Sequence, residues 1–139
     1  MVESDGKAML TYVRPVSYYG FNTTLVAHLF DGESWGPATN ITTGTDEDWW
    51  FTTSAAGDGF SLSWIREGII EDSETRDAIY SSSYHSGVWG EPVEIHSAEN
   101  ITDISSTKTR EDYSILTWSE TDGINHSIRA KTYDNMVWN

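Results

Sequence analysis

Residues 79–89 read IYSSSYHSGVW, and the chain contains this pattern three times. The first copy is LVAHLFDGESW at residues 25–35, and the last copy is IRAKTYDNMVW at residues 128–138. In each copy an aliphatic residue comes first, an aromatic residue follows five positions later, and a tryptophan follows after five more. This spacing predicts a strand, a tight turn, and a tryptophan that opens the next strand.

The repetition extends well beyond this stretch. Trp35 and Trp64 are 29 residues apart, and so are Trp89 and Trp118. The segments AMLTYV, FSLSWI and SILTWS each place a leucine two positions before an aromatic residue. They are one strand written three times, at spacings of 52 and 54 residues. Repeats of this length are typical of propellers, solenoids and repeat arrays.

Alternation of apolar and polar residues indicates strands, and helical periodicity is absent. We predict an all-β fold of β-propeller blades, built from about three four-stranded antiparallel repeats of 52–54 residues, of which the first and last are incomplete. The chain is one repeat domain, with blades at about residues 1–41, 49–95 and 103–139. Expected strands of the second repeat are 49–55, 60–66, 78–84 and 89–95, with turns at 57–59, 67–77 and 85–87. A solenoid or an immunoglobulin-like sandwich explains the gapless repeat less well.

The ends of the repeats suggest an unfinished ring. The chain begins a few residues before Leu10, so the first repeat is expected to lack its innermost strand. It ends at the tryptophan that would open the outermost strand of the last repeat. Propellers usually close with at least four blades. We therefore expect this chain to be part of a larger ring or to form a homo-oligomer, with a dimer giving a six-bladed ring.

The repeated hairpin resembles the Asp-box of sialidase-like propellers, whose pattern is Ser-x-Asp-x-Gly-x-Thr-Trp. The three versions here are Leu29-x-Asp31-x-x-x-Trp35, Ser83-x-His85-x-Gly87-x-Trp89 and Thr132-x-Asp134-x-x-x-Trp138. Each is one residue shorter than the family pattern, and His85 replaces the aspartate. The resemblance implies a motif that shapes a turn and has no part in chemistry. A weaker resemblance to six-bladed fucose-binding lectins also implies sugar recognition.

Sialidase-like catalysis would need three converging arginines, a tyrosine paired with a glutamate, and an acidic aspartate. Arg14 and Arg66 occupy equivalent repeat positions, but Glu120 stands at the third. This broken pattern gives an arginine triad poor support, and no catalytic residue is assigned. The four histidines lie on different kinds of element and predict no metal site.

The composition limits the possible binding partners and the possible cellular location of the protein. The formal net charge of −14 argues against binding to nucleic acid and to anionic membranes. No apolar run is long enough for a membrane helix, and the absence of cysteine excludes disulfides and thiol catalysis. Asn22, Asn40, Asn100 and Asn125 each begin an Asn-x-Ser/Thr motif. Their number favours an extracellular or cell-surface location.

The predicted propeller is a disk, and one of its two faces carries the loops between the second and third strands and the links between blades. Eleven of the 22 acidic residues are expected on that face. They are Asp46, Glu47, Asp48, Glu67, Glu71, Asp72, Glu74, Asp77, Glu99, Glu120 and Asp122. One interpretation is a solvated surface that keeps the protein soluble. Another is a calcium site, with oxygens from Asp46, Glu47 and Asp48 or from Glu71, Asp72 and Glu74.

Aromatic residues in the first repeat suggest a ligand site on the same face. Tyr18, Tyr19 and Phe21 lie in its variable loop, and the nearby candidates are Arg14, Arg66 and Glu67. Aromatic rings beside carboxylates suit sugars, although these rings could instead cover a neighbouring strand or an oligomer partner. We expect a non-catalytic recognition module of a surface or secreted protein that binds glycan or protein. The alternatives are a fragment of a sialidase-like glycoside hydrolase and a purely structural array.

Overall fold

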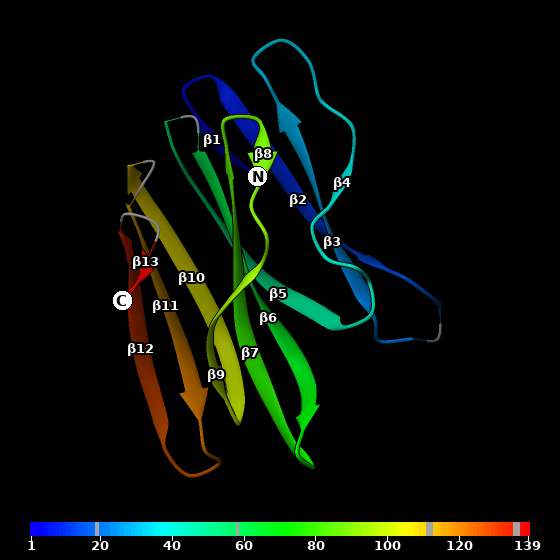
Figure 1. Cartoon of the computed structure of the whole chain (residues 1–139), viewed down its shortest axis with the longest axis vertical. Helices are drawn as coiled ribbons and strands as arrows, with labels where there is room; N and C mark the ends of the chain where they lie inside the picture. The colour runs from blue at the N-terminus through cyan, green and yellow to red at the C-terminus, as the bar shows by residue number, and fades with distance from the viewer. Residues whose placement is uncertain (19, 58, 111–112, 135–136) are drawn as a thin grey trace.

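The computed structural model describes residues 1–18, 20–57, 59–110, 113–134 and 137–139. Within these residues the chain forms three separate antiparallel sheets and no helix, so the prediction of an all-β fold is confirmed (Figure 1). No helix in this part of the chain could therefore cross a membrane. None of the three sheets closes on itself, and their identity as propeller blades stays a prediction.

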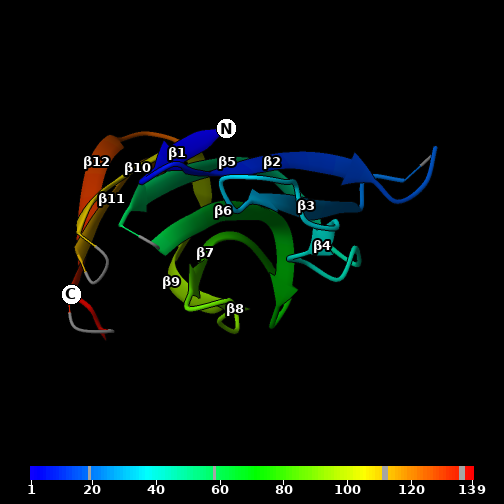
Figure 2. The same cartoon turned by 90° about the horizontal axis from the view of Figure 1, so that it is seen from above.

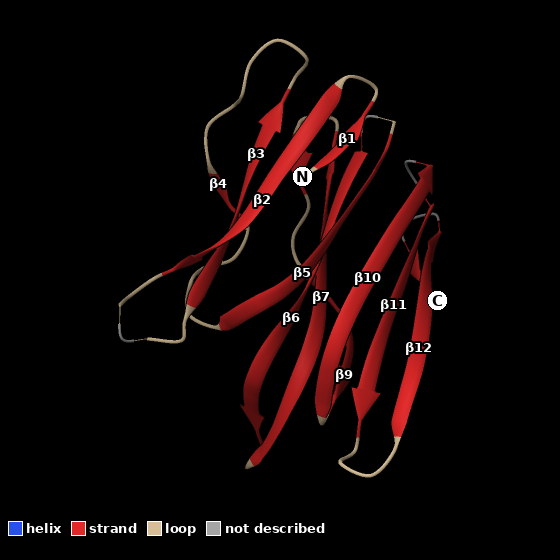
Figure 3. Cartoon of the chain, turned by 180° about the vertical axis from the view of Figure 1, so that it is seen from behind, coloured by secondary structure: helices blue, strands red, loops and turns tan. Residues whose placement is uncertain are grey.

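Each sheet is antiparallel, and strands that follow one another in the chain pair with each other, apart from β8 and β9 (Figure 3). The first sheet contains β1 (Val2–Ser4), β2 (Lys7–Pro15), β3 (Thr23–Phe30) and β4 (Thr39–Asn40). The second contains β5 (Glu47–Ala56), β6 (Gly59–Glu71), β7 (Glu74–His85), β8 (Val88–Trp89) and β9 (Val93–Ala98). The third contains β10 (Asn100–Arg110), β11 (Tyr113–Thr121), β12 (His126–Asp134) and β13 (Val137–Trp138). Both β8 and β9 pair with β7.

The repeated stretch forms the same hairpin in every sheet, as its spacing predicts. The aromatic residue and the tryptophan are paired across the turn, by an isolated bridge in the first copy and between neighbouring strands in the other two. Their ring centroids are 5.3, 5.6 and 5.2 Å apart in chain order. A backbone hydrogen bond recurs one residue beyond the tryptophan, where the amides of Gly36, Gly90 and Asn139 donate to the carbonyls of Leu29, Ser83 and Thr132. The hairpin is thus a structural unit of the scaffold.

The second sheet lies between the other two, as Figure 2 shows. One face of it contacts the first sheet, where Leu62 and Trp64 pack against Leu25. Its opposite face contacts the third sheet, where Ile65 and Ile79 join a cluster that includes Ile104, Leu116 and Trp118. The core therefore consists of two apolar layers, one in each space between sheets.

Small side chains bring the second and third sheets close together. Ser61, Ser63, Ser81 and Ser83 lie on the face of the second sheet that meets the third. The hydroxyl of Ser63 donates to that of Ser81 at 3.0 Å, which satisfies both groups away from water. Thr52 of β5 reaches Ser106 of β10, and their hydroxyl oxygens are 3.2 Å apart. These two residues are separated by one repeat of 54 positions.

Replacing Ser63 by leucine should lower the free energy of unfolding by about 1–3 kcal/mol, because extra methyl groups do not fit a closely packed interface. Thr117 occupies the equivalent position in the third sheet, whose corresponding face is open. Thr117→Leu should therefore change stability by only about 0.5 kcal/mol. Urea denaturation followed by circular dichroism measures both values. Equal losses would contradict the assigned packing faces.

Two predictions for the second repeat were wrong. The charged run 67–77 forms no loop, because β6 continues to Glu71 and β7 starts at Glu74. Only Asp72 and Ser73 form the turn, with positive φ of 52° and 69°, and such two-residue turns match the twist of a hairpin. The outermost strand of the second repeat is divided into β8 and β9, with Pro92 between them. Proline has no amide hydrogen to donate to the ladder.

The first sheet does contain an innermost strand, contrary to expectation. β1 pairs with β2, with Glu3 opposite Ala8. This pair corresponds to Ala55 opposite Phe60 in the second sheet. β1 therefore corresponds in repeat position to the last three residues of β5.

Candidate functional site

Two adjoining hollows of the second and third sheets lie at the end of the structure that carries the connection between the second and third strand of each sheet. We call this end the loop end. The loop end comprises the loop 16–22, the turn 72–73, the loop 122–125 and the links that enter β5 and β10. The larger hollow has a volume of about 650 Å³ and is lined by Asp72, Glu74, Thr75, Arg76, Ser97, Ala98 and Glu99. The smaller one, of about 150 Å³, is lined by Ala98, Glu99, Glu120, Thr121, Asp122, Asn125, Ser127 and Arg129.

The short passage from β9 to β10 joins the two hollows. Ala98 and Glu99 line both of them. Asp77 holds this passage in place, because one of its carboxylate oxygens accepts the amide of Gly68 at 3.2 Å and the other accepts the amide of Ile101 at 3.0 Å. Apart from Ala98, every described side chain that lines the hollows is polar. The arrangement suits a hydroxylated or charged ligand better than an apolar one.

Glu120 anchors the third-sheet side of the smaller hollow. One of its carboxylate oxygens accepts the Nε of Arg129 at 2.9 Å. The other lies 2.7 Å from Nε2 of His96 and accepts the indole Nε1 of Trp118 at 2.9 Å. Partial burial acts to raise the pKa of Glu120, but these three hydrogen bonds together lower it. Glu120 is thus an ionised group that ties β9 to β11 and β12.

The loop 122–125 is built around the carboxylate of Asp122. Its Oδ1 accepts the amides of Ile124 at 2.9 Å and Asn125 at 2.7 Å. Its Oδ2 accepts the side-chain amide of Asn125 at 3.1 Å. The backbone and side-chain hydrogen bonds from Asn125 and Ile124 lower the pKa of Asp122 to about 2. A fixed anion therefore stands at the rim of the smaller hollow.

The loop 122–125 should keep its conformation down to unusually low pH. Because the folded-state pKa of Asp122 lies below its usual 3.8, the hydrogen bonds of its carboxylate contribute fully above pH 3.8 and are lost as the pH falls to about 2. NMR titration of the Asp122 carboxyl and of the Ile124 and Asn125 amides measures this midpoint. Asn125→Ala should raise it. A midpoint at 3.8 in the native chain would contradict the described loop.

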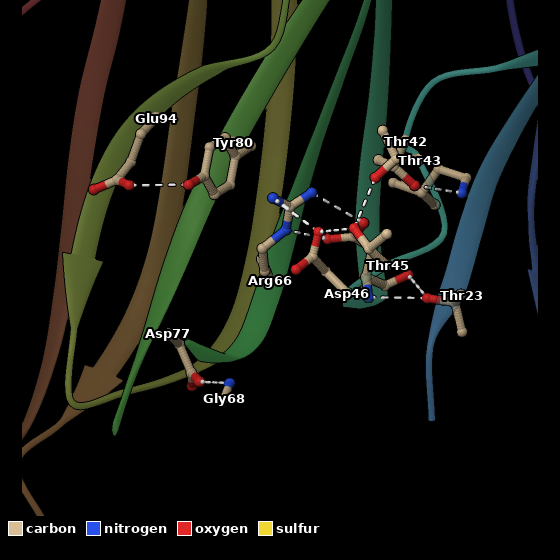
Figure 4. Close-up of polar contacts among 12 residues, drawn as sticks. Thr23, Thr42, Thr43, Thr45, Asp46, Arg66, Gly68, Asp77, Tyr80 and Glu94 are labelled. Atoms are coloured by element: carbon tan, nitrogen blue, oxygen red, sulfur yellow. Dashed lines mark hydrogen bonds and ion pairs between the residues drawn. The ribbon is translucent and has the colours of Figure 1, made fainter. Parts of the chain in front are cut away.

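Arg66 lies in a second polar cluster, between the first and second sheets (Figure 4). Its Nε and Nη2 donate to the two carboxylate oxygens of Asp48 at 2.9 and 3.3 Å, and Nη1 lies 3.2 Å from Asp46. The side chain of Asp48 is completely buried. Its backbone amide donates to the hydroxyl of Thr23 at 2.9 Å, which joins the cluster to β3. Arg66, a predicted ligand-binding residue, thus has an internal structural role.

The cluster continues towards the outer strands of the second sheet. The guanidinium carbon of Arg66 lies 4.7 Å from the centre of the Tyr80 ring. The hydroxyl of Tyr80 donates to Glu94 at 3.0 Å, and Arg76 pairs with the same carboxylate at 3.2 Å. Burial, followed by the hydrogen bond to Glu94, raises the pKa of Tyr80. The phenol therefore stays protonated at neutral pH.

Glu67 belongs neither to the lining of the two hollows nor to the Arg66 cluster. Its partial burial, followed by the nearby charges of Asp77 and Glu47, raises its pKa. A hydrogen bond with Trp50 acts in the opposite direction. A carboxyl whose pKa is shifted by burial and by neighbouring charges is often found at a functional site. Charge networks with a purely structural role shift pKa values as well.

The predicted aromatic ligand site is not part of the hollows. Tyr18 and Phe21 are 93% and 70% exposed. They lie in the loop between β2 and β3, which extends from the first sheet on the side away from the third (Figure 1). Arg14 is also apart from them, because it donates to Asn40 on the first sheet's outer face at 3.1 Å. Tyr19 lies outside the described residues.

The acidic residues proposed for calcium are dispersed. Asp46 and Asp48 bind Arg66, while Glu47 lies near Glu67. Asp72 and Glu74 line the larger hollow, and the side chain of Glu71 is outside the described residues. Within the described ranges, no group of three or more histidine or acidic side chains is arranged to hold a metal ion.

Comparisons with known proteins found no similarity. No protein-family model matches the chain, and neither a curated protein nor a solved structure matches it. The candidate site therefore stands on the geometry of this chain alone.

Proposed function

We propose that this chain is a non-catalytic recognition module of a surface or secreted protein, and that it binds a glycan at the loop end. The polar lining of the two adjoining hollows carries this proposal. Carboxylates such as Glu99 and Asp122 can accept hydrogen bonds from sugar hydroxyls. Arg129 and Asn125 can donate to them.

The exposed rings of the loop 16–22 add a second feature suited to sugars. Tyr18 and Phe21 belong to the same loop end but lie on the first sheet, so they could contact a distant unit of an extended glycan. A ligand long enough to cross the sheets would use both regions. This arrangement favours an oligosaccharide over a single sugar.

A glycan array probed with the labelled chain tests the proposal. Glu99→Ala should abolish binding, because Glu99 lines both hollows and is exposed, so that its removal leaves the fold intact. Tyr18→Ala should weaken the binding of long glycans more than that of short ones. Glu33→Ala removes an exposed carboxylate in the turn at the opposite end of the sheets and should have no effect. An array on which no glycan binds would contradict the proposal.

A sialidase-like hydrolase is the second candidate, and one observation favours it. The Tyr80–Glu94 pair with two nearby arginines matches part of what such catalysis needs. However, Arg66 is already bound to Asp48, and the raised pKa of Tyr80 disfavours the ionised form that would act as the nucleophile. We therefore expect no hydrolysis of a fluorogenic sialoside. Turnover that Tyr80→Phe abolishes would reverse this preference.

A further inference from the structure

One pair of repeat positions is buried in the second and third sheets but exposed in the first sheet. The leucine and aromatic residue of the central hairpin strand occur in β2, β6 and β11. Their exposed fractions are 40% and 37% for Leu10 and Tyr12, 0% for both Leu62 and Trp64, and 0% and 4% for Leu116 and Trp118. The preceding sheet covers the pairs in β6 and β11. No described residue covers the pair in β2 in the same way.

On the opposite face of each sheet, the equivalent residue is buried in the first and second sheets but exposed in the third. The aliphatic residue that opens the repeated stretch is Leu25, Ile79 or Ile128. Leu25 and Ile79 are completely buried by the sheet that follows each of them, whereas Ile128 is 86% exposed. The outer face of the third sheet is therefore open at the position where the other two sheets receive a neighbour.

These two positions meet each other in both internal interfaces. Leu25 packs against Leu62 and Trp64 between the first and second sheets. Ile79 packs in the same cluster as Leu116 and Trp118 between the second and third. The remaining combination is Ile128 with Leu10 and Tyr12. It cannot form within one chain, because the first and third sheets lie on opposite sides of the second (Figure 2).

The third sheet also has a recess beside Ile128. Thr117, Ser119 and Ile128 line a shallow hollow of about 140 Å³ on this face. In the second sheet, Ile65 and Ile79 stand at the positions of Ser119 and Ile128 and belong to the same packed cluster as Trp118. The hollow is therefore the place where an aromatic ring such as that of Tyr12 would lie.

We propose that a second copy of this chain covers these faces, with the first sheet of one copy packed against the third sheet of the other. This contact is head-to-tail, because it joins two different surfaces. Such contacts close into a ring when the rotation between copies permits, and two copies would bring six sheets together. This contact rests on the burial of equivalent positions and on the hollow beside Ile128, and it is independent of the proposed glycan binding.

Charge sets the conditions under which the contact should form. Each copy carries a formal net charge of −14, so two copies repel each other at long range. Salt screens this repulsion without weakening apolar contacts. Association should therefore strengthen as ionic strength rises. A contact made mainly of ion pairs would show the opposite dependence.

Sedimentation equilibrium of the native chain and two variants tests the proposal. The native chain should have twice the mass of one chain at micromolar concentration. Tyr12→Arg places a charge on the contact face of the first sheet, and Ile128→Arg places one on the contact face of the third. Each variant alone should therefore be a monomer. A mixture of the two keeps one intact contact and should form a one-to-one pair. Ile124→Arg, at an equally exposed position in the loop 122–125, should leave the native mass unchanged.

Three results would overturn the proposal. A native chain that stays monomeric at all accessible concentrations would show that another partner covers these faces. A single variant that still dimerises would show a symmetric contact or a different surface. A mixture that stays monomeric would exclude the pairing of these two faces. Circular dichroism of each variant verifies that it is folded, which is expected because both substituted side chains are open to solvent.

Discussion

Trp64→Ala should lower the free energy of unfolding by about 3–5 kcal/mol, which is the cost of removing a large aromatic side chain from a core. Trp64 is completely buried between the first and second sheets, beside Leu25 and Leu62. Its indole nitrogen has no hydrogen-bond partner among the described residues, so the loss comes from packing alone. A domain of this size has only about 5–15 kcal/mol of stability, so the variant should be close to unfolding. Urea denaturation followed by circular dichroism gives the value.

Tyr12→Ala is the matched control for this prediction, because Tyr12 stands at the same repeat position but is 37% exposed. In dilute solution, where a single chain is monomeric, its cost should be about 1 kcal/mol or less. Similar losses for the two variants would show that the order of the sheets is wrong. A cost for Tyr12→Ala that grows with protein concentration would support the head-to-tail contact.

Asp48→Ala should lower the free energy of unfolding by about 2–3 kcal/mol. Removing one member of a buried ion pair strands the other, and this typically costs 3–5 kcal/mol. The side chain of Asp48 is completely buried, whereas that of Arg66 is 19% exposed, so water reduces the penalty. Arg66 would keep its 3.2 Å contact to Asp46 and its position over the Tyr80 ring.

Asp46→Ala serves as the comparison for Asp48→Ala. The Asp46 side chain is 37% exposed, and exposed ion pairs contribute about 0–1 kcal/mol. Thermal or urea unfolding at neutral pH distinguishes the two variants. If Asp46→Ala proved the more damaging, Asp48 could not be the buried partner of Arg66.

The repeated hairpins could be predicted from the sequence because they depend on short-range rules. Alternation of side chains identifies strands such as residues 60–65, and the fixed distance from Tyr84 to Trp89 leaves room only for a tight turn. These features need no knowledge of how one sheet meets the next.

The polar clusters could not be predicted, because they depend on strand register. Counting back from the turn between β5 and β6 places Asp48 opposite Glu67. The structure instead has a bulge at Trp49, which shifts Asp48 by one position so that it faces Arg66. The Tyr80–Glu94 pair depends likewise on the break at Pro92 that separates β8 from β9.

One signal for the Glu120 cluster was present in the sequence. Arg66 and Glu120 occupy equivalent repeat positions with opposite charges. Such a reversal indicates that the two residues have different partners, and the structure places His96 and Arg129 around Glu120. Identifying His96 required the path of β9, which the alignment of repeats alone does not give.

Above all, consecutive repeats fold into neighbouring sheets, and equivalent positions of those sheets lie side by side. Thr52 and Ser106 are one repeat apart and in direct contact, and the chain contains no cysteine. The double variant Thr52→Cys with Ser106→Cys should therefore form a disulfide on mild oxidation, since its side chains are within the reach of such a bond. Thr52→Cys with Ser105→Cys is the control, because Ser105 points to the opposite face of β10. We predict a rapid and complete loss of free thiols in monomeric chains of the first variant only. Two persistent free thiols in the first variant, or equal oxidation of both variants, would contradict the account.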